Sequence, residues 1–209
     1  ILYSEDARWR EKYGEDCGFF QGGSVQAASC ASFVPGFEDR PDQILLSCTN
    51  NLFAGGCTPK YFILQAVFPD IWEEKDIRRK MRELAEQAGR MGIAAAGGHT
   101  EISAAVSEPV YAVTCLGERN ETGAAAIPRP GWDLVVTRWI GLGGTAALAK
   151  RREGELKEVF PPALIERAKE FEIWMSVERE AKIIGRYGSC VMHDLSQGGI
   201  FGGLWELGE

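Results

Sequence analysis

The sequence predicts an α/β (α+β) protein in which helices cover one face of a sheet, and three observations carry this prediction. Residues 61–68 form a nearly continuous apolar run that Pro69 closes, as expected of a strand. From residue 73 to residue 90, apolar residues recur at steps of three and four with charges between them, which is the period of an amphipathic helix. Residues 109–116 form a second apolar run and predict another strand.

Shorter signals predict the elements between these three. Residues 44–48 are apolar at nearly every position and predict a short strand, while the small residues of 50–57 predict a short helix. Gly92 suits the end of the long helix, and residues 93–96 predict a strand directly after it. Because strands with consecutive apolar residues are covered on both faces, we expect a further layer opposite the helices.

The second half of the chain predicts a separate unit. Residues 119–131 combine glycine, alanine and proline and predict a hinge, which divides the chain into domains 1–122 and 123–209. Beyond it, strands are expected at 133–137 and 190–192, and helices at 146–151, 162–170 and 173–187 and from residue 200. Two strands do not make a stable sheet, so we expect the second domain to be incomplete.

Composition limits the class of protein. The chain has 209 residues, 45% of them hydrophobic and 25% charged, as in soluble globular proteins. A net charge of −7 argues against a general surface for nucleic acid or acidic membranes, and no apolar run is long enough to span a bilayer. The six cysteines form no C-x-x-C pair, so we expect reduced, mostly buried thiols and a cytoplasmic location.

The polar sequence Gly97-Gly98-His99-Thr100-Glu101 is the leading candidate for a site. It follows a predicted buried strand, and open α/β folds bind ligands at the carboxyl ends of strands. Glycines let backbone N–H groups approach an anion, and the next three side chains offer an imidazole, a hydroxyl and a carboxylate. The alternative interpretation is a tight turn between two strands.

Two further segments carry weaker signals. His193 and Asp194 follow a predicted strand beside a glycine pair, so they face a cleft or merely cap the strand. Gly143 and Gly144 lie in a turn that contacts phosphate or simply begins a helix. His99 and His193 with Cys30 or Cys190 offer a softer metal site, such as one for zinc, although their spacing matches no known ligand pattern.

Four segments stand out in order along the chain: Asn50-Asn51-Leu52-Phe53-Ala54-Gly55-Gly56-Cys57-Thr58-Pro59, Gly97-Gly98-His99-Thr100-Glu101, Pro130-Gly131-Trp132-Asp133-Leu134-Val135-Val136-Thr137 and Met192-His193-Asp194-Leu195-Ser196-Gln197-Gly198-Gly199. Taken in this order and spacing, they resemble the aminoimidazole ribonucleotide (AIR) synthetase-like superfamily. This group includes thiamine-monophosphate kinase, selenophosphate synthetase and the hydrogenase maturation protein that dehydrates a carbamoyl group. The resemblance begins near residue 14, and two further stretches, 139–146 and 202–207, look closest to the hydrogenase-maturation branch.

The resemblance implies a fold, a ligand and a set of roles. It implies a ferredoxin-like N-terminal domain that pairs with a second copy into a dimeric β-barrel, with ATP and magnesium in a cleft near the interface. It implies ATP-dependent ligase or dehydratase-type chemistry on an unknown substrate, with Asp194 and His193 as catalytic residues and Asp16 and Glu101 as metal ligands. The nucleotide-binding positions that it implies are Asn51, Gly97, Gly98, His99, Thr100, Gly143 and Gly144.

This sequence also departs from the pattern of the superfamily. Cys30, Asn51 and His99 stand where an aspartate is common, and each change removes a negative charge from the magnesium site. Two hypotheses therefore remain open. One is an ATP-dependent enzyme with a weakened carboxylate site, and the other is a non-catalytic ligand-binding or scaffold homologue that has lost turnover.

Overall fold

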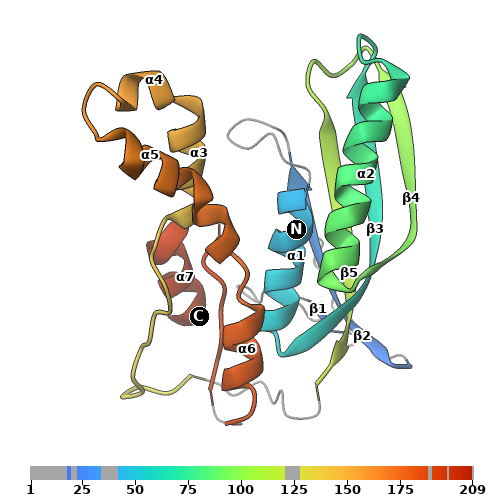
Figure 1. The fold of residues 1–209 in the computed structure, drawn as a ribbon. Coiled ribbons are helices and arrows are strands. Elements are labelled where there is room, and N and C mark those ends of the chain that lie inside the picture. Colours follow the sequence, from blue (N-terminus) through green and yellow to red (C-terminus); the bar gives the residue numbers. More distant parts are fainter. Residues whose placement is uncertain are drawn as a thin grey trace.

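A single five-stranded sheet forms the first half of the molecule (Figure 1). The computed structural model describes residues 18–19, 23–33, 42–120, 128–187, 190–196 and 198–208. The strand order is β1-β2-β5-β3-β4, with β3 and β4 parallel and the other pairs antiparallel. The strands are β1 (Gly18–Phe19), β2 (Val25–Phe33), β3 (Cys57–Pro69), β4 (Ala94–Ser103) and β5 (Val110–Arg119).

Two helices, α1 (Asp42–Ala54) and α2 (Glu74–Met91), cover one face of this sheet, as predicted. The chain runs β-α-β-α-β-β from β2 to β5, so it departs from the β-α-β-β-α-β order of the expected ferredoxin-like layout. The parallel β3–β4 pair explains the difference, because a parallel neighbour requires a crossover, and α2 supplies it.

The core lies between the helices and the sheet. Along β3 the side chains alternate, with Phe62 and Leu64 buried under the helices and Tyr61 and Ile63 exposed at 43% and 40% on the other face. Within the described chain that second face has no covering layer. Consecutive apolar residues in β3 therefore indicate an open apolar face, rather than a strand buried on both sides within one chain.

The predicted strand at 44–48 is wrong, because these residues belong to α1. Ile44, Leu45, Cys48 and Leu52 are all fully or almost fully buried, and their spacing is that of one helix face. The short run 44–48 has the same composition as a strand. Only its continuation through Leu52 reveals the helical period.

Helix α2 and its end match the prediction. Gly92 adopts a left-handed conformation with φ of 69°, and its N–H caps the carbonyls of Ala88 and Gly89. Strand β4 begins near the predicted position but continues to Ser103, since it pairs with β3 as far as Pro69. The glycine-rich segment 97–101 therefore lies inside a strand at the edge of the sheet, and the prediction that it follows a strand is wrong.

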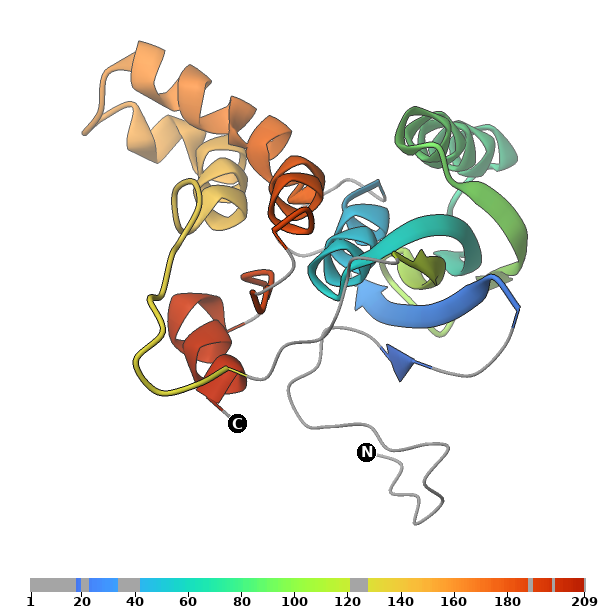
Figure 2. The same cartoon turned by 90° about the horizontal axis from the view of Figure 1, so that it is seen from below.

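In the second half of the chain, the regular elements of the described residues are all helices, joined by long coil segments (Figure 2). The strands predicted at 133–137 and 190–192 are wrong: both segments are coil, and no neighbouring strand among the described residues pairs with them. The expected hinge lies partly outside the described residues. The helices are α3 (Leu142–Arg151), α4 (Glu153–Leu156), α5 (Pro162–Lys169), the 3₁₀ helix η2 (Glu170–Trp174), α6 (Glu178–Ile184) and α7 (Gly199–Gly208).

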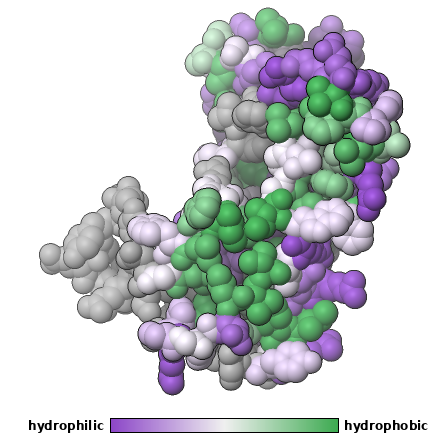
Figure 3. Space-filling model, turned by 90° about the vertical axis from the view of Figure 1, so that its left-hand side faces the viewer, coloured by the Kyte–Doolittle hydropathy of each residue, from purple (hydrophilic) through white to green (hydrophobic). Residues whose placement is uncertain are grey.

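Apolar side chains gather on the face of this unit that carries α7 and the coil before α3 (Figure 3). Leu134 and Val135 of the coil and Phe201 and Trp205 of α7 are all exposed. The coil at 133–137 has the composition of a strand and lies beside the apolar helix α7. This arrangement is what we expect of a sheet layer whose other strands are missing. The incomplete second domain stays a prediction. No helix in the described part of the chain combines the length and the apolar character needed to cross a bilayer.

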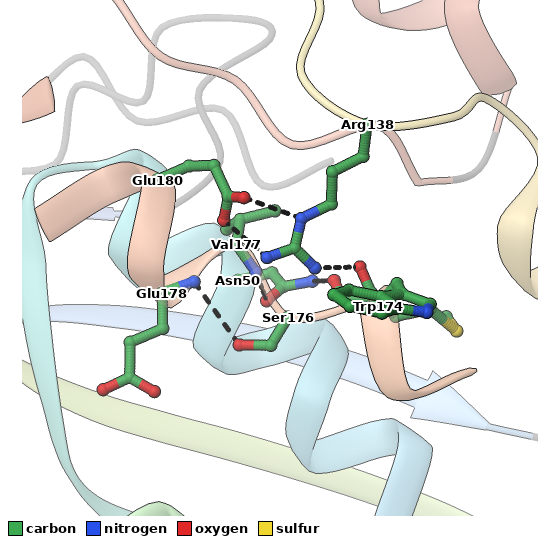
Figure 4. A network of polar contacts seen from close by, with 8 residues as sticks. Asn50, Arg138, Trp174, Ser176, Val177, Glu178 and Glu180 are labelled. Atoms are coloured by element: carbon green, nitrogen blue, oxygen red, sulfur yellow. Dashed lines mark hydrogen bonds and ion pairs between the residues drawn. The ribbon is translucent and has the colours of Figure 1, made fainter. Parts of the chain in front are cut away.

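A polar network fixes the second unit against α1 (Figure 4). The Asn50 side chain donates to the Met175 carbonyl at 2.9 Å and accepts from the Val177 N–H at 3.1 Å. Arg138 binds the Glu180 carboxylate through two nitrogens at 2.7 and 2.9 Å, and it also donates to the Trp174 carbonyl. Asn50 is buried, so this segment is held to α1 by directional bonds.

Candidate functional site

The edge strand β4 carries the predicted glycine-rich segment and divides it between the two faces of the sheet. In a parallel pair, residues in register share a face, and successive residues alternate. Gly98 and Thr100 pair with Leu64 and Ala66 and therefore face α2. By the same register, Gly97, His99 and Glu101 pair with Ile63, Gln65 and Val67 on the open face.

A β-bulge sets this division. Between Phe62 and Ile63 the pairing jumps from Ala95 to Gly97, which leaves Ala96 as an extra residue in β4. Gly98 is required for the close approach of the two strands that follows. A Cβ atom built there would lie 2.3 Å from the Leu64 carbonyl oxygen, whereas one at Gly97 would meet nothing within 4 Å.

The open-face half of the segment is ionic. His99 Nε2 lies 3.2 Å from Glu101 Oε2, and the two side chains are 68% and 51% exposed. An imidazole and a carboxylate at this spacing offer an anion partner and a cation ligand on one strand. Both remain accessible to a ligand that approaches the sheet edge.

The other half borders an apolar groove between α2 and β4, with a cavity volume of about 160 Å³. Sequence reasoning missed its walls, because Met81 and Ala85 look like ordinary members of an amphipathic helix. The register of β4, which no sequence pattern shows, decides that Gly98 and Thr100 face this groove. The residues that line it are Phe62, Leu64, Met81, Leu84, Ala85, Ala95, Gly97, Gly98, His99 and Thr100.

Asn51 lies at a different part of the sheet. Its Nδ2 donates to Ser29 Oγ at 2.9 Å, and its Oδ1 is buried without a partner among the described residues. The register places Ser29 level with Ala95 across three strand spacings, or about 14 Å. Glu101 lies about 17 Å further along β4, so one chain does not bring Asn51 and Glu101 to a single ion.

The remaining predicted residues lie in the helical unit. The His193 side chain is 7% exposed, with Nε2 2.8 Å from Glu206 Oε2 of α7 and Nδ1 2.8 Å from the Asp194 carbonyl. Asp194 is buried as well, while Gly143 and Gly144 lie in the first turn of α3. Helices α3 and α7 lie across α1 from β4 in both ribbon views (Figures 1 and 2), so one chain does not gather all the predicted residues.

Metal-binding chemistry finds little support in this part of the chain. The described residues include no cluster of three or more histidine, cysteine, aspartate or glutamate side chains that could hold an ion. The hypothesis of a zinc site therefore finds no such cluster among the described residues. Asp16, the predicted magnesium ligand, lies outside them. Cys48 and Cys115 are buried, as predicted, and hydrogen bonding between them, followed by burial, raises the pKa of Cys115 far above its usual range.

Sheet and site together define a class of protein: a mixed α/β domain with an open apolar sheet face and a glycine-bearing edge strand, joined to a helical unit. The chain belongs to the family described as AIR synthase related protein, N-terminal domain, whose profile matches residues 14–119, just over half of the sequence. This agrees with the resemblance seen in the sequence motifs.

Solved structures share the fold at low sequence identity. The complex of thiamine-monophosphate kinase from Aquifex aeolicus with AMPPCP and TMP is 17% identical, with a TM-score of 0.60 over 83% of this chain and 57% of that one. Hydrogenase maturation protein HypE in complex with ATP is 18% identical, with a TM-score of 0.55 over 65% and 43%. The chain thus spans about half the length of these proteins, and no curated protein matches it.

Proposed function

We propose that this protein binds ATP at the edge strand β4 and serves the ATP-dependent chemistry of its family. One observation carries the proposal: the segment from Gly97 to Glu101 leaves backbone, hydroxyl, imidazole and carboxylate groups accessible along an edge of β4 that no other described strand pairs with. The presence of AMPPCP or ATP in two solved structures of the same fold supports it.

The phosphates belong on the open-face side of this edge. Gly97 has no side chain to hinder their approach, and the His99 imidazole offers a ring N–H that can donate to them. Glu101 supplies one carboxylate, and magnesium commonly binds one or two carboxylates together with substrate phosphates. Asp16 is the second proposed metal ligand. When bound, the ion would neutralise phosphate charge.

A second copy of the chain completes the site in this proposal. Tyr61 and Ile63 leave an apolar face on the sheet that a partner's sheet would cover, as the dimeric barrel of the superfamily implies. Asn51, His193 and Asp194, which one chain keeps away from β4, are the residues that a partner would contribute. His193 and Asp194 are the proposed catalytic pair, and Gly143 and Gly144 the proposed phosphate contacts of α3.

Calorimetry with ATP, with and without magnesium, tests this function. Since Asn51 and His99 replace carboxylates, we expect weak binding by the natural chain, and the double variant Asn51→Asp/His99→Asp should bind magnesium-ATP more tightly. Each recovered charge-assisted contact is worth about 1 kcal/mol or more. Absence of nucleotide binding by both proteins would refute the proposal.

The second candidate is a homologue that binds nucleotide without turning it over. One observation favours it: His193 already contacts a carboxylate of α7 and the carbonyl of its neighbour, as a structural residue does. A phosphate-release assay at saturating ATP separates the two candidates. Release that a His193→Gln variant lowers at least tenfold supports the enzyme, and no release above background supports the binding homologue.

A further inference from the structure

We propose that the groove between α2 and β4 is a nucleobase subsite that accepts a purine ring. This inference rests on the proposed nucleotide-binding function and adds to it the position of the base. The groove lies on the helix side of β4, while the ionic pair lies on the open side. A nucleotide bound across this edge would therefore place its two chemically different ends on the two faces of one strand.

Small residues create the groove. Its floor consists of Ala95, Gly98 and Thr100, which the register turns toward α2. The buried face of α2 runs through Ile77, Lys80, Leu84 and Ala88 and packs on the core, whereas every residue of β4 up to Ile102 is exposed. The edge strand thus remains uncovered beside the helix.

The size and the shape of the groove suit a flat ring. Its volume of about 160 Å³ is close to that of an apolar cavity of about 150 Å³ that accepts benzene. Met81 and Ala85 form one wall, and Phe62 and Leu64 form the back. A ring that enters between them would bury apolar surface on both of its faces.

The polarity of the groove excludes the phosphates and favours a base. Among its lining residues, only His99 is titratable, and the register directs its side chain to the opposite face. No lysine or arginine lines the groove, so nothing there would balance phosphate charge. The Thr100 hydroxyl and the peptide groups of 97–100 offer donors and acceptors of the kind that the edge of a purine uses.

Filling the groove tests the subsite. Ala85→Leu places a larger side chain in its wall at an exposed helix position, and Glu86→Leu introduces the same side chain at the next exposed residue, which does not line it. Calorimetry would use three probes: adenosine, ATP and inorganic triphosphate. We expect Ala85→Leu to weaken adenosine and ATP binding at least tenfold and to leave triphosphate binding unchanged, while Glu86→Leu changes none of the three.

Ala95→Leu, which fills the groove from the floor, provides a second variant in case Ala85→Leu does not fold. Equal adenosine affinity in the natural chain and in a folded filling variant would overturn the subsite, and so would a natural chain that binds no adenosine. Failure of the proposed function gives a different result, in which neither ATP nor triphosphate binds. Triphosphate binding without adenosine binding would retain the function and remove the base subsite.

Discussion

At the scale of single residues, Gly97 and Gly98 look alike in the sequence and differ in the structure. Gly98→Ala puts a methyl group against the Leu64 carbonyl, and we expect a loss of about 1–3 kcal/mol in the free energy of unfolding. Gly97→Ala is the matched control, because its methyl group meets open space. Urea denaturation of both variants measures the difference, and equal midpoints would contradict the close approach of the two strands.

Asn50 illustrates a role that the sequence motif concealed. Asn50→Ala removes both bonds to the 175–177 segment and should cost about 1–3 kcal/mol, since buried backbone groups lose their partners. Asn120→Ala is the control, because Asn120 is exposed and accepts a single bond from Thr58. Denaturation midpoints test whether Asn50→Ala lowers the stability more than Asn120→Ala does. Faster proteolysis between α5 and α6 in the Asn50 variant alone would locate the effect.

At the scale of elements, the helix α4 is held by charges on its surface. Hydrogen bonds from Lys157 and then from Lys169 lower the pKa of Glu153 from 4.5 to about 2. A lowered folded-state pKa means that the stabilisation is present above pH 4.5 and is lost as pH falls toward 2. In the Glu153→Gln variant, the free energy of unfolding should therefore fall less between pH 4.5 and pH 2 than it does in the natural chain. The difference should shrink in 1 M salt, because all three side chains keep contact with solvent: Lys157 is 47% exposed, Glu153 33% and Lys169 21%.

The elements that the sequence predicted well are those with long, regular patterns. Helix α2 and strands β3 and β5 carry many periodic residues, so local pattern and tertiary structure agree. The segment 44–48 is too short to separate a helix from a strand, and 133–137 has strand composition without a described neighbour to pair with. In the candidate site, the residues 97–101 could be found from sequence. Their division between two faces depends on pairing with β3, which no local pattern contains.

At the scale of the whole molecule, the open sheet face predicts self-association. Ile63→Lys introduces a charge into that face and should convert a dimer into a monomer by light scattering at micromolar concentration. Ile71→Lys is the control, since Ile71 is 81% exposed in the turn before α2. A natural chain that is monomeric at this concentration would contradict the proposed dimer.

The extra residue Ala96 in β4 determines which side chains of the edge strand face the helices and which face the open side. If β4 paired with β3 one-to-one from Ala95 onward, His99 would lie opposite Ala66 and Glu101 opposite Phe68, both of which are buried. Such a slip would force an imidazole and a carboxylate against the core, at a high desolvation cost. The bulge at Ala96 shifts the pairing by one residue and so keeps His99 and Glu101 on the open face. A chain without Ala96 would therefore keep the same faces, whereas one more residue before Gly97 would require a second bulge or exchange the polar and apolar sides of the edge.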